Sequence, residues 1–384
     1  MAACYFDHNA TTPLDPRVRQ AMLPWMGERF GNPSSIHSFG QVAREAVERA
    51  REQVARLLDA SPVEIVFTAS ATEANNSVIR SCVASRSGRA HLVVSLMEHP
   101  SVSAVATDLE RSGSEVAWVP PERDGVVAAD RVLAVVESRT ALVCVALANN
   151  IIGTVQPVET VSERCRELGV PVLCDAVQGI GKMPISVGDL GPDFLSLSAH
   201  KFNGPPGAGA LWIRNEVEWR PFLLGGSQER RRRAGTQNVP AIVGMGEAAE
   251  LALRELESRQ ANMAALRDRL ESGLRNLGDL TIHGESATRL PNTTHVAFAG
   301  IDALSLLIRL DLAGYAVSAG SACSSGSVEP STALLSMGID KSEALSSLRI
   351  SLGAGNETAE VDRFLMDLER ELSALRQARV GSET

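Results

Sequence analysis

Lys201 is the residue whose type and position first suggest chemistry. It follows the apolar run Phe194–Ser198 and stands in the segment S-A-H-K-F-N-G-P-P-G. Most lysines lie in solvent, and a solvated loop residue is the alternative interpretation here. A lysine that is partly buried at the carboxyl end of a strand, however, has a lowered pKa and can serve as a Schiff-base nucleophile.

Asp175 stands at the end of the preceding apolar run, Val170–Cys174, and Gln178 lies shortly after it. Such an aspartate often only caps a helix. A buried carboxylate at this point can instead pair with a protonated pyridine nitrogen. A lysine combined with such an aspartate is the pairing used with pyridoxal phosphate, so the two residues together favour that cofactor.

Ala71 and Thr72 lie in T-A-S-A-T-E-A-N-N, where a strand is expected to end and a helix to begin. The free N–H groups and the dipole of a helix N-terminus bind phosphate. Ser70 and Glu73 also have the spacing of a capping box, which is the simpler interpretation, and both can hold at once.

His99 and Asn150 also follow expected strands, in M-E-H-P-S and A-N-N-I-I-G-T. His99 could lie flat on an aromatic ring, although a single histidine is more often a surface or core residue. Asn150 could hydrogen-bond a ring oxygen or a substrate carboxylate. Each signal is weak alone, and the argument rests on all of them falling at the ends of strands.

Strands that alternate with helices must position these residues. An amphipathic helix is expected over 41–58, with Val42, Ala46, Ala50, Val54 and Leu57 on its apolar face. Helices are also expected at Ser101–Arg111 and Glu159–Leu168. This alternation predicts an α/β fold with a mostly parallel sheet, helices on both faces and a ligand at the carboxyl ends of the strands. The expected strands are Glu64–Thr68, His91–Leu96, Ala141–Leu147, Val170–Cys174, Phe194–Ser198 and Gly209–Ile213.

A second, smaller α/β unit is expected after a long helical stretch, Val239–Leu277, that is broken once. It ends in an amphipathic helix, Glu360–Arg376. The strands expected in this unit are Leu280–His283, Thr294–Phe298, Ala316–Ser318 and Leu348–Leu352.

The composition is that of an ordinary globular chain. Of 384 residues, 44% are hydrophobic and 22% are charged, which excludes disordered and collagen-like classes. The net charge of −9 argues against nucleic acid or an anionic membrane as the main partner. We find no leader pattern and no long apolar run, so we expect a cytoplasmic protein without a membrane span.

The six cysteines are far apart, which fits neither a disulfide framework nor a zinc site. Cys323 lies in the Gly/Ser-rich segment S-A-G-S-A-C-S-S-G, with few apolar neighbours. The other five lie in or beside expected elements, where packing is the simpler role: Cys4, Cys82, Cys144, Cys165 and Cys174.

Several motifs occur in one order along the chain: D-H-N-A-T-T-P, A-T-E-A-N-N, M-E-H-P-S, D-A-V-Q-G, S-L-S-A-H-K, R-A-G-T-Q-N, S-A-G-S-A-C-S-S-G and S-L-R-I-S-L. Together they resemble the cysteine desulfurases of the NifS/IscS type, which are pyridoxal phosphate enzymes of the class V aminotransferase group. The resemblance implies fold type I of these enzymes. It further implies a large cofactor domain over 16–255, and a small domain of 1–15 and 256–384 that carries the catalytic cysteine loop.

The resemblance also implies roles for individual residues. Lys201 would form the Schiff base and act as base, Cys323 would be the nucleophile, and His99 would stack on the ring and move protons. Asn150 and Arg349 would hold the substrate carboxylate. The remaining cofactor contacts would be Ala71, Thr72, Ser198 and His200 at the phosphate, Thr236 at the phosphate of the other subunit, Asp175 at the pyridine nitrogen and Gln178 at the ring hydroxyl.

The implied activity converts L-cysteine to L-alanine in a homodimer and leaves a persulfide on Cys323. The sulfur would pass to an acceptor or iron–sulfur scaffold protein. No intrinsic metal site is expected, although the Cys323 persulfide would transiently ligate a cluster.

Two features depart from the family pattern, and three other functions remain open. Ile151 stands where many relatives have glutamate, and Arg230–Arg233 is either solvated surface or a rim that attracts anions. The other functions are a selenocysteine lyase, an aminotransferase, and a catalytically silent scaffold for iron–sulfur assembly.

Overall fold

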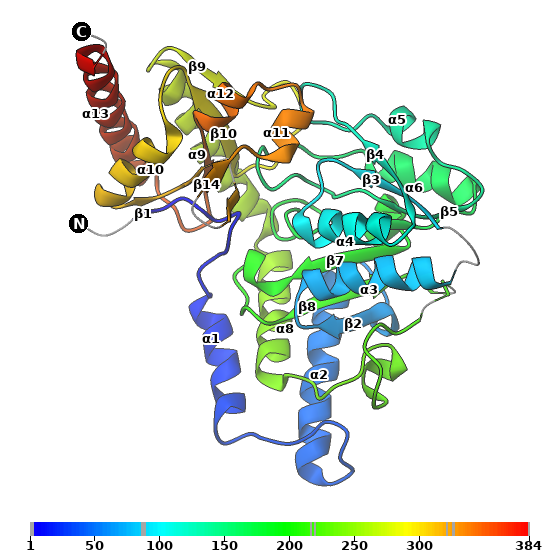
Figure 1. Ribbon diagram of the computed structural model, residues 1–384. Helices are drawn as coiled ribbons and strands as arrows, with labels where there is room; N and C mark the ends of the chain where they lie inside the picture. Colours follow the sequence, from blue (N-terminus) through cyan, green and yellow to red (C-terminus); the bar gives the residue numbers. More distant parts are fainter. Residues whose placement is uncertain are drawn as a thin grey trace.

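A seven-stranded sheet forms the centre of the larger part of the molecule (Figure 1). The computed structural model describes residues 4–85, 90–215, 217–218, 220–319, 322–324 and 327–382. The strand order is β2-β8-β7-β6-β5-β3-β4, and β8 is the one strand of this sheet that runs antiparallel to its neighbours. The strands are β2 (Ile65–Thr68), β3 (His91–Ser95), β4 (Glu115–Val119), β5 (Thr140–Cys144), β6 (Val172–Asp175), β7 (Phe194–Ser198) and β8 (Gly209–Ile213).

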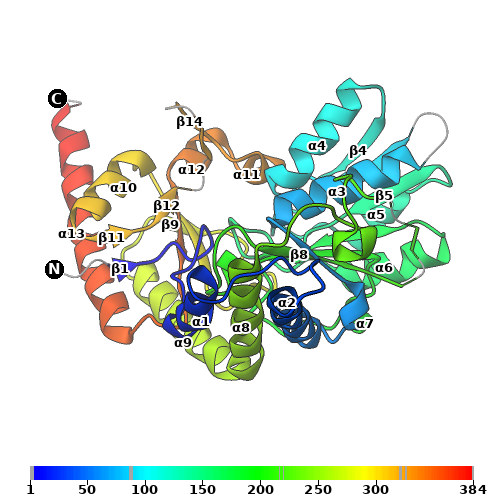
Figure 2. The same ribbon diagram turned by 90° about the horizontal axis from the view of Figure 1, so that it is seen from below.

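Helices cover both faces of this sheet, so most of its strands are buried on both sides and read as continuous apolar runs (Figure 2). Successive strand residues point to opposite faces: in β3, Val93 belongs to one core, and Leu92 and Val94 belong to the other. One face packs against α3 (Ala71–Ala84) and α4 (Pro100–Arg111). The other packs against α1 (Pro16–Met22), α2 (Ser38–Leu57), α5 (Ala129–Ala134), α6 (Val158–Glu167), α7 (Val187–Leu190) and α8 (Val239–Arg254).

A second, antiparallel sheet has its own core and lies beside the first (Figure 1). Its order is β12-β15-β10-β9, and α9 (Leu256–Arg275), α10 (Ala303–Leu312) and α13 (Thr358–Ser382) contribute to its core. Phe6 belongs to this core and meets Phe364 edge to face, with ring centroids 5.4 Å apart. The remaining elements of this part are β1 (Cys4–Tyr5), β9 (Leu280–Ile282), β10 (Thr293–Phe298), β11 (Tyr315–Ala316), β12 (Ser318–Ala319), β13 (Ala322–Ser324), β14 (Ser327–Glu329), α11 (Thr332–Ser336), α12 (Lys341–Leu345) and β15 (Ser347–Ser351).

The predicted α/β architecture is confirmed, and so is the break in the long helix, which falls at Glu255. The structure corrects details. In α2, Val42 is 46% exposed, because Ala43 and Val47 are the residues that face the core of the large sheet. The prediction missed β4, an edge strand whose residues are mostly half-buried and which therefore lacks a strong apolar run.

Two strand ends also differ from the prediction. Strand β5 ends at Cys144 rather than at residue 147, although the N–H groups of Val145 and Leu147 still donate to carbonyls along β6. The predicted strand Ala316–Ser318 is divided between β11 and β12, which pair with different partners. The predicted domain boundaries, 16–255 and 1–15 with 256–384, stay a prediction. None of the described helices is long and apolar enough to span a membrane.

Candidate functional site

A cavity of about 390 Å³ lies at the carboxyl ends of the central strands. Its walls come from loops that are far apart in the sequence, because the ends of neighbouring parallel strands meet at one edge of a sheet. Ten of the predicted site residues line it: Ala71, Thr72, His99, Asn150, Asp175, Gln178, Ser198, His200, Lys201 and Arg349.

Lys201 ends the short 3-10 helix that directly follows β7. Its Nζ donates to the backbone oxygens of Asn9, at 2.6 Å, and Ala10, at 2.7 Å. Burial, together with the positive charge of Arg349, lowers the pKa of Lys201 to about 8. This amine is therefore far more available as a nucleophile or base near neutral pH than an exposed lysine.

A chain of hydrogen bonds links Asp175 to His99. Asn75 Nδ2 donates to Asp175 Oδ2 at 2.8 Å and lies 2.9 Å from Ser101 Oγ. Ser101 in turn donates its backbone N–H to His99 Nδ1 at 3.0 Å, and its Oγ lies 2.9 Å from the same nitrogen. Because Nδ1 accepts, a neutral His99 carries its proton on Nε2, and burial lowers the pKa of this histidine.

The N-terminus of α3 opens onto the cavity through Ser70, Ala71 and Thr72. Ser70 Oγ caps the helix by accepting from the Glu73 N–H at 3.1 Å, as the capping-box interpretation predicts. The Glu73 carboxylate departs from that prediction, because it accepts from the Ala69 N–H at 2.9 Å rather than from Ser70. The N–H groups of Ala71 and Thr72 lie in the first turn, which has no intrahelical acceptors, so this wall suits an anion.

Ser198, the last residue of β7, and His200, in the same 3-10 helix as Lys201, also line the cavity. His200 Nδ1 lies 3.0 Å from Thr11 Oγ1, and burial with the nearby charge of Lys201 lowers the pKa of His200 to about 4. This histidine is thus neutral near pH 7.

Arg349 reaches the cavity from β15 of the second sheet. Its guanidinium donates through Nη2 to Asp7 Oδ1 at 2.6 Å and through Nη1 to the backbone oxygen of Asn150 at 3.1 Å. Its Nε is buried and has no hydrogen-bond partner within the described part of the chain. An unused donor beside a cavity is suited to a carboxylate from a bound molecule.

The remaining two predicted site residues are Thr236 and Cys323. Thr236 is exposed and does not line the cavity of its own chain. The backbone of Cys323 lies on β13, which pairs with β14, but its side chain lies outside the described residues. The other five cysteines are buried, as the packing interpretation predicts, and burial raises the pKa of Cys4, Cys144, Cys165 and Cys174.

Ile151 and the arginine run, Arg230–Arg233, are the two departures from the family pattern. Ile151 lines a neighbouring cavity of about 650 Å³, together with His99 and Asn150. Within the arginine run, Arg233 binds both oxygens of Glu73, at 2.7 and 3.1 Å, and Arg230 pairs with Glu48 at 3.2 Å.

Sequence patterns assigned no role to four residues that the structure brings to the site: Asn9, Asn75, Glu98 and Lys182. Asn9, Asn75 and Glu98 stood within noted motifs, which was the available signal. Burial, together with the negative charge of the nearby Asp175, raises the pKa of Glu98 to about 8. Lys182 is buried and donates to Asn9 and Gln178. Among the described residues, no group of three or more His, Cys, Asp or Glu is placed to hold a metal ion.

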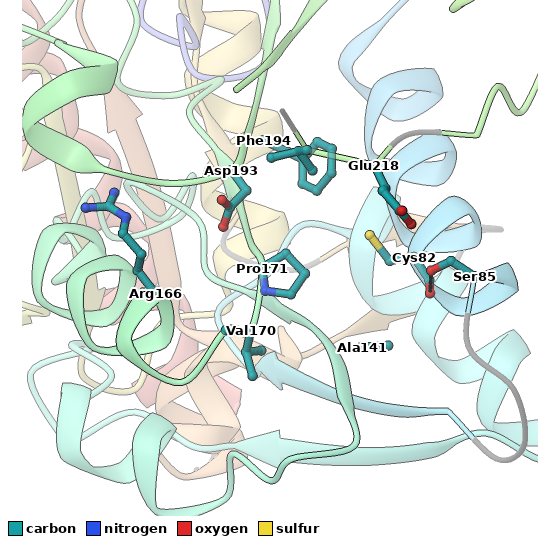
Figure 3. Close-up of a pocket in the computed structure, with 11 residues that line it drawn as sticks. Cys82, Ser85, Ala141, Arg166, Val170, Pro171, Asp193, Phe194 and Glu218 are labelled. Atoms are coloured by element: carbon teal, nitrogen blue, oxygen red, sulfur yellow. Dashed lines mark hydrogen bonds between the residues drawn. The ribbon is translucent and has the colours of Figure 1, made fainter. Parts of the chain in front are cut away.

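A second cavity, of about 430 Å³, lies at the opposite edge of the sheet (Figure 3). Pro171 and Asp193 directly precede β6 and β7, so it stands at the amino ends of these strands. Its lining includes Cys82, Ser85 and Arg166 but none of the predicted site residues. The two cavities have similar volumes, so it is the chemistry of the lining residues that identifies the first cavity as the site.

The walls of the first cavity fit pyridoxal phosphate. An anion-binding helix N-terminus, a buried carboxylate and an amine of lowered pKa match the phosphate, the ring nitrogen and the aldehyde carbon of that molecule. The orphaned Nε of Arg349 leaves a donor for the carboxylate of an amino-acid substrate.

Comparisons with known proteins agree with this chemistry. The family model for class-V aminotransferases matches residues 4–364. The chain is 42% identical over 366 residues to a cysteine desulfurase of Trichormus azollae, which covers 95% of this chain and 92% of the relative. It is 43% identical over 364 residues to the cysteine desulfurase IscS of Methanosarcina thermophila, which covers 94% and 90%. A solved NifS-like protein superposes with a TM-score of 0.92 at 40% identity and covers 97% of this chain and 100% of that one.

Proposed function

The chain belongs to the aminotransferase class-V family and is a pyridoxal phosphate-dependent cysteine desulfurase, and from this premise we propose how its residues divide the work. The observation that carries the proposal is the meeting of Lys201, Asp175 and His99 in one cavity. The reaction converts L-cysteine and the Cys323 thiol into L-alanine and a Cys323 persulfide. The substrate C–S bond breaks, an S–S bond forms, and the β-carbon of the product gains a proton.

Lys201 holds the cofactor and then moves the α-proton of the substrate. When bound, the cofactor supplies an electron sink for the charge left on the α-carbon. Asp175, which accepts from Asn75 Nδ2 at 2.8 Å, would pair with the ring nitrogen. His99 would stack on the ring and donate or accept protons at Nε2, because its Nδ1 accepts from the Ser101 N–H.

Arg349 and Asn150 bind the substrate carboxylate. Asp7 holds Arg349 through Nη2 at 2.6 Å, while Nε has no hydrogen-bond partner among the described residues and is left as a donor. A guanidinium that binds a carboxylate through two N–H groups also fixes its orientation. The α-carbon of the substrate is thereby aimed at Lys201.

The N-terminus of α3 would hold the phosphate together with Ser198 and His200, and Gln178 would donate to the ring oxygen. Thr236, exposed in the single chain, completes the phosphate site of a second subunit, so the enzyme is a homodimer. Cys323 passes sulfur to an acceptor or iron–sulfur scaffold protein, and the enzyme works in the cytoplasm, where its buried thiols stay reduced.

Incubation of the cofactor-loaded protein with L-cysteine and a reductant tests this function. We expect sulfide and alanine in equal amounts, and we expect Cys323→Ser to keep the visible absorbance of the cofactor but to lose most sulfide release. The matched control is Cys165→Ala, since burial makes that thiol unreactive by raising its pKa to about 11. Sulfide release by Cys323→Ser at the wild-type rate would refute the role of Cys323, and absence of alanine in the wild type would refute the function.

A further inference from the structure

Lys182 is a buried lysine to which the reaction described above gives no role. Its side chain lies in the turn after β6 and the residue is 4% exposed. Lysines are almost never this buried unless they are paired. The hydrogen-bond partners of Lys182 are two amide oxygens: Nζ donates to Gln178 Oε1 at 2.8 Å and to Asn9 Oδ1 at 3.0 Å.

The charges that face Lys182 favour its neutral form. Burial lowers its pKa well below the usual value, and the positive charges of Lys201 and Arg349 lower it further. His8, on the N-terminal segment, faces the same amine and has a pKa lowered to about 4. A neutral amine has two N–H groups, and both have an acceptor here.

Two hydrogen bonds fix the orientation of the Gln178 amide, one from Lys182 to its oxygen and one from its nitrogen to the backbone of Asn9. The two ends of a side-chain amide are similar in shape but opposite in polarity, since one donates and the other accepts. With Oε1 bound to Lys182, Nε2 donates at 3.0 Å to the backbone oxygen of Asn9, which lines the cavity together with Gln178. That same oxygen accepts from Lys201 Nζ at 2.6 Å.

Asn9 is fixed from its other side by the second sheet. Its Oδ1 also accepts from Asn292 Nδ2 at 3.1 Å, and its Nδ2 donates to Thr293 Oγ1 at 2.9 Å. Lys182 therefore joins Gln178 to an N-terminal segment that is anchored elsewhere. None of these hydrogen bonds joins two oppositely charged groups, so their contribution is to fix the orientation of the side-chain amides.

We propose that Lys182 is a positioning residue of this site, whose buried amine holds the Gln178 amide so that an N–H faces the ring oxygen of the bound cofactor. The inference rests on the proposed function, because it assumes that Gln178 meets that oxygen. Without Lys182, the amide can turn its oxygen toward the anionic ring oxygen, which is unfavourable. The donor that stabilises the anion is then lost.

The pH titration of the visible absorbance of the cofactor-loaded protein tests this proposal. Lys182→Met removes the amine but keeps an unbranched apolar stem, and Lys341→Met, at an exposed lysine, is the matched control. A ring oxygen without its donor holds a proton more tightly. The midpoint should therefore rise by about one pH unit or more in Lys182→Met, the size expected for one lost hydrogen bond to a charged group, and should not move in Lys341→Met.

Gln178→Ala shows whether the effect passes through the amide. It should raise the midpoint as Lys182→Met does, and the double variant should show no further rise, because the two residues act on one contact. An unchanged midpoint in either single variant, or additive shifts in the double variant, would overturn the proposal. A lower unfolding temperature in Lys182→Met with an unchanged midpoint would mean a merely structural role and would also overturn it.

Lys182→Gln keeps the test decisive if Lys182→Met does not fold. Its amide can still donate to Gln178 Oε1, so its midpoint should lie closer to that of the wild type than to that of Gln178→Ala. A midpoint closer to that of Gln178→Ala would contradict the proposal. Failure of the function is distinct from all these results, since the wild-type protein would then show no visible cofactor absorbance at all.

Discussion

Lys201 and Arg349 are two cations that share one cavity, and each serves a different chemistry. The guanidinium of Arg349 presents several N–H groups in one plane, which suits a carboxylate. Its charge, added to burial, lowers the pKa of Lys201 to about 8. The same proximity that binds the substrate therefore also prepares the amine to react.

This coupling predicts the pH dependence of cofactor loading. Only a neutral Lys201 can bond the aldehyde, so the loading rate of the cofactor-free protein should rise with pH and level off above a midpoint of about 8. In Arg349→Gln the lost positive charge should move this midpoint upward, whereas Arg349→Lys should keep it. Stopped-flow absorbance over a range of pH measures the rate. A wild-type midpoint near 10.5, the ordinary lysine value, would contradict the interpretation.

At the scale of elements, a buried ion pair shapes the loop that carries the arginine run and Thr236. Glu229 accepts from Arg51 Nη1 at 2.7 Å and Nη2 at 3.0 Å, and from the Phe67 N–H of β2 at 2.9 Å. Burial alone would raise the pKa of Glu229, but the bonds and charge of Arg51 outweigh it and hold the pKa low. Glu229 also has a positive φ of 46°, a conformation that its fixed carboxylate compensates.

Glu229→Ala should therefore destabilise the fold strongly, because it removes the buried partner of the Arg51 guanidinium, which is 2% exposed, and leaves Arg51 only the exposed carboxylate of Glu48. We expect a loss of about 3–5 kcal/mol in the free energy of unfolding. Urea unfolding, followed by circular dichroism, measures it.

The matched control for that variant is Arg56→Met, which removes an exposed arginine paired with Glu250 at 2.6 Å. This change should cost less than about 1 kcal/mol, since solvent screens such pairs. Equal losses of unfolding free energy in the two variants would contradict this prediction, because they would show that the buried Arg51 pair matters no more to stability than an exposed pair.

At the scale of the whole molecule, the exposed apolar side chains are not spread evenly. Several gather in one stretch around the start of α2, where the Phe30 and Phe39 rings lie 5.3 Å apart. A concentration of this kind on a folded chain is typical of a protein interface, and it supports the proposed homodimer. The exposed members of this stretch are Leu23, Met26, Phe30, Ile36, Phe39 and Val42.

Ile36→Asp should convert the dimer to a monomer. Ile36 is 87% exposed in the single chain, so an aspartate there costs the monomer little but places a charge in the interface. Light scattering after gel filtration measures the mass. Leu312→Asp, at a residue that is 82% exposed on α10, is the control and should leave the dimer intact. A monomeric wild type, or a dimeric Ile36→Asp variant, would contradict this interface.

The sequence by itself determined most of the elements, although not the edge strand β4, and most of the cavity wall. Apolar runs and helical spacing are local, and the carboxyl ends of parallel strands must share an edge, so the order of residues along the chain is enough to bring His99, Asp175 and Lys201 together. The roles of buried polar residues such as Asn75 were hard to recognise from the sequence, because an asparagine in a helix can have many other roles.

Only the tertiary structure decided what meets across long separations. Asn9 reaches Lys201, Arg349 reaches Asp7, and Lys182 is buried with amide partners, through the way two sheets and the N-terminal segment pack together. These contacts depend on register and burial rather than on local spacing. The same burial sets the pKa of Lys201, and for that reason no pattern of residues could have specified it.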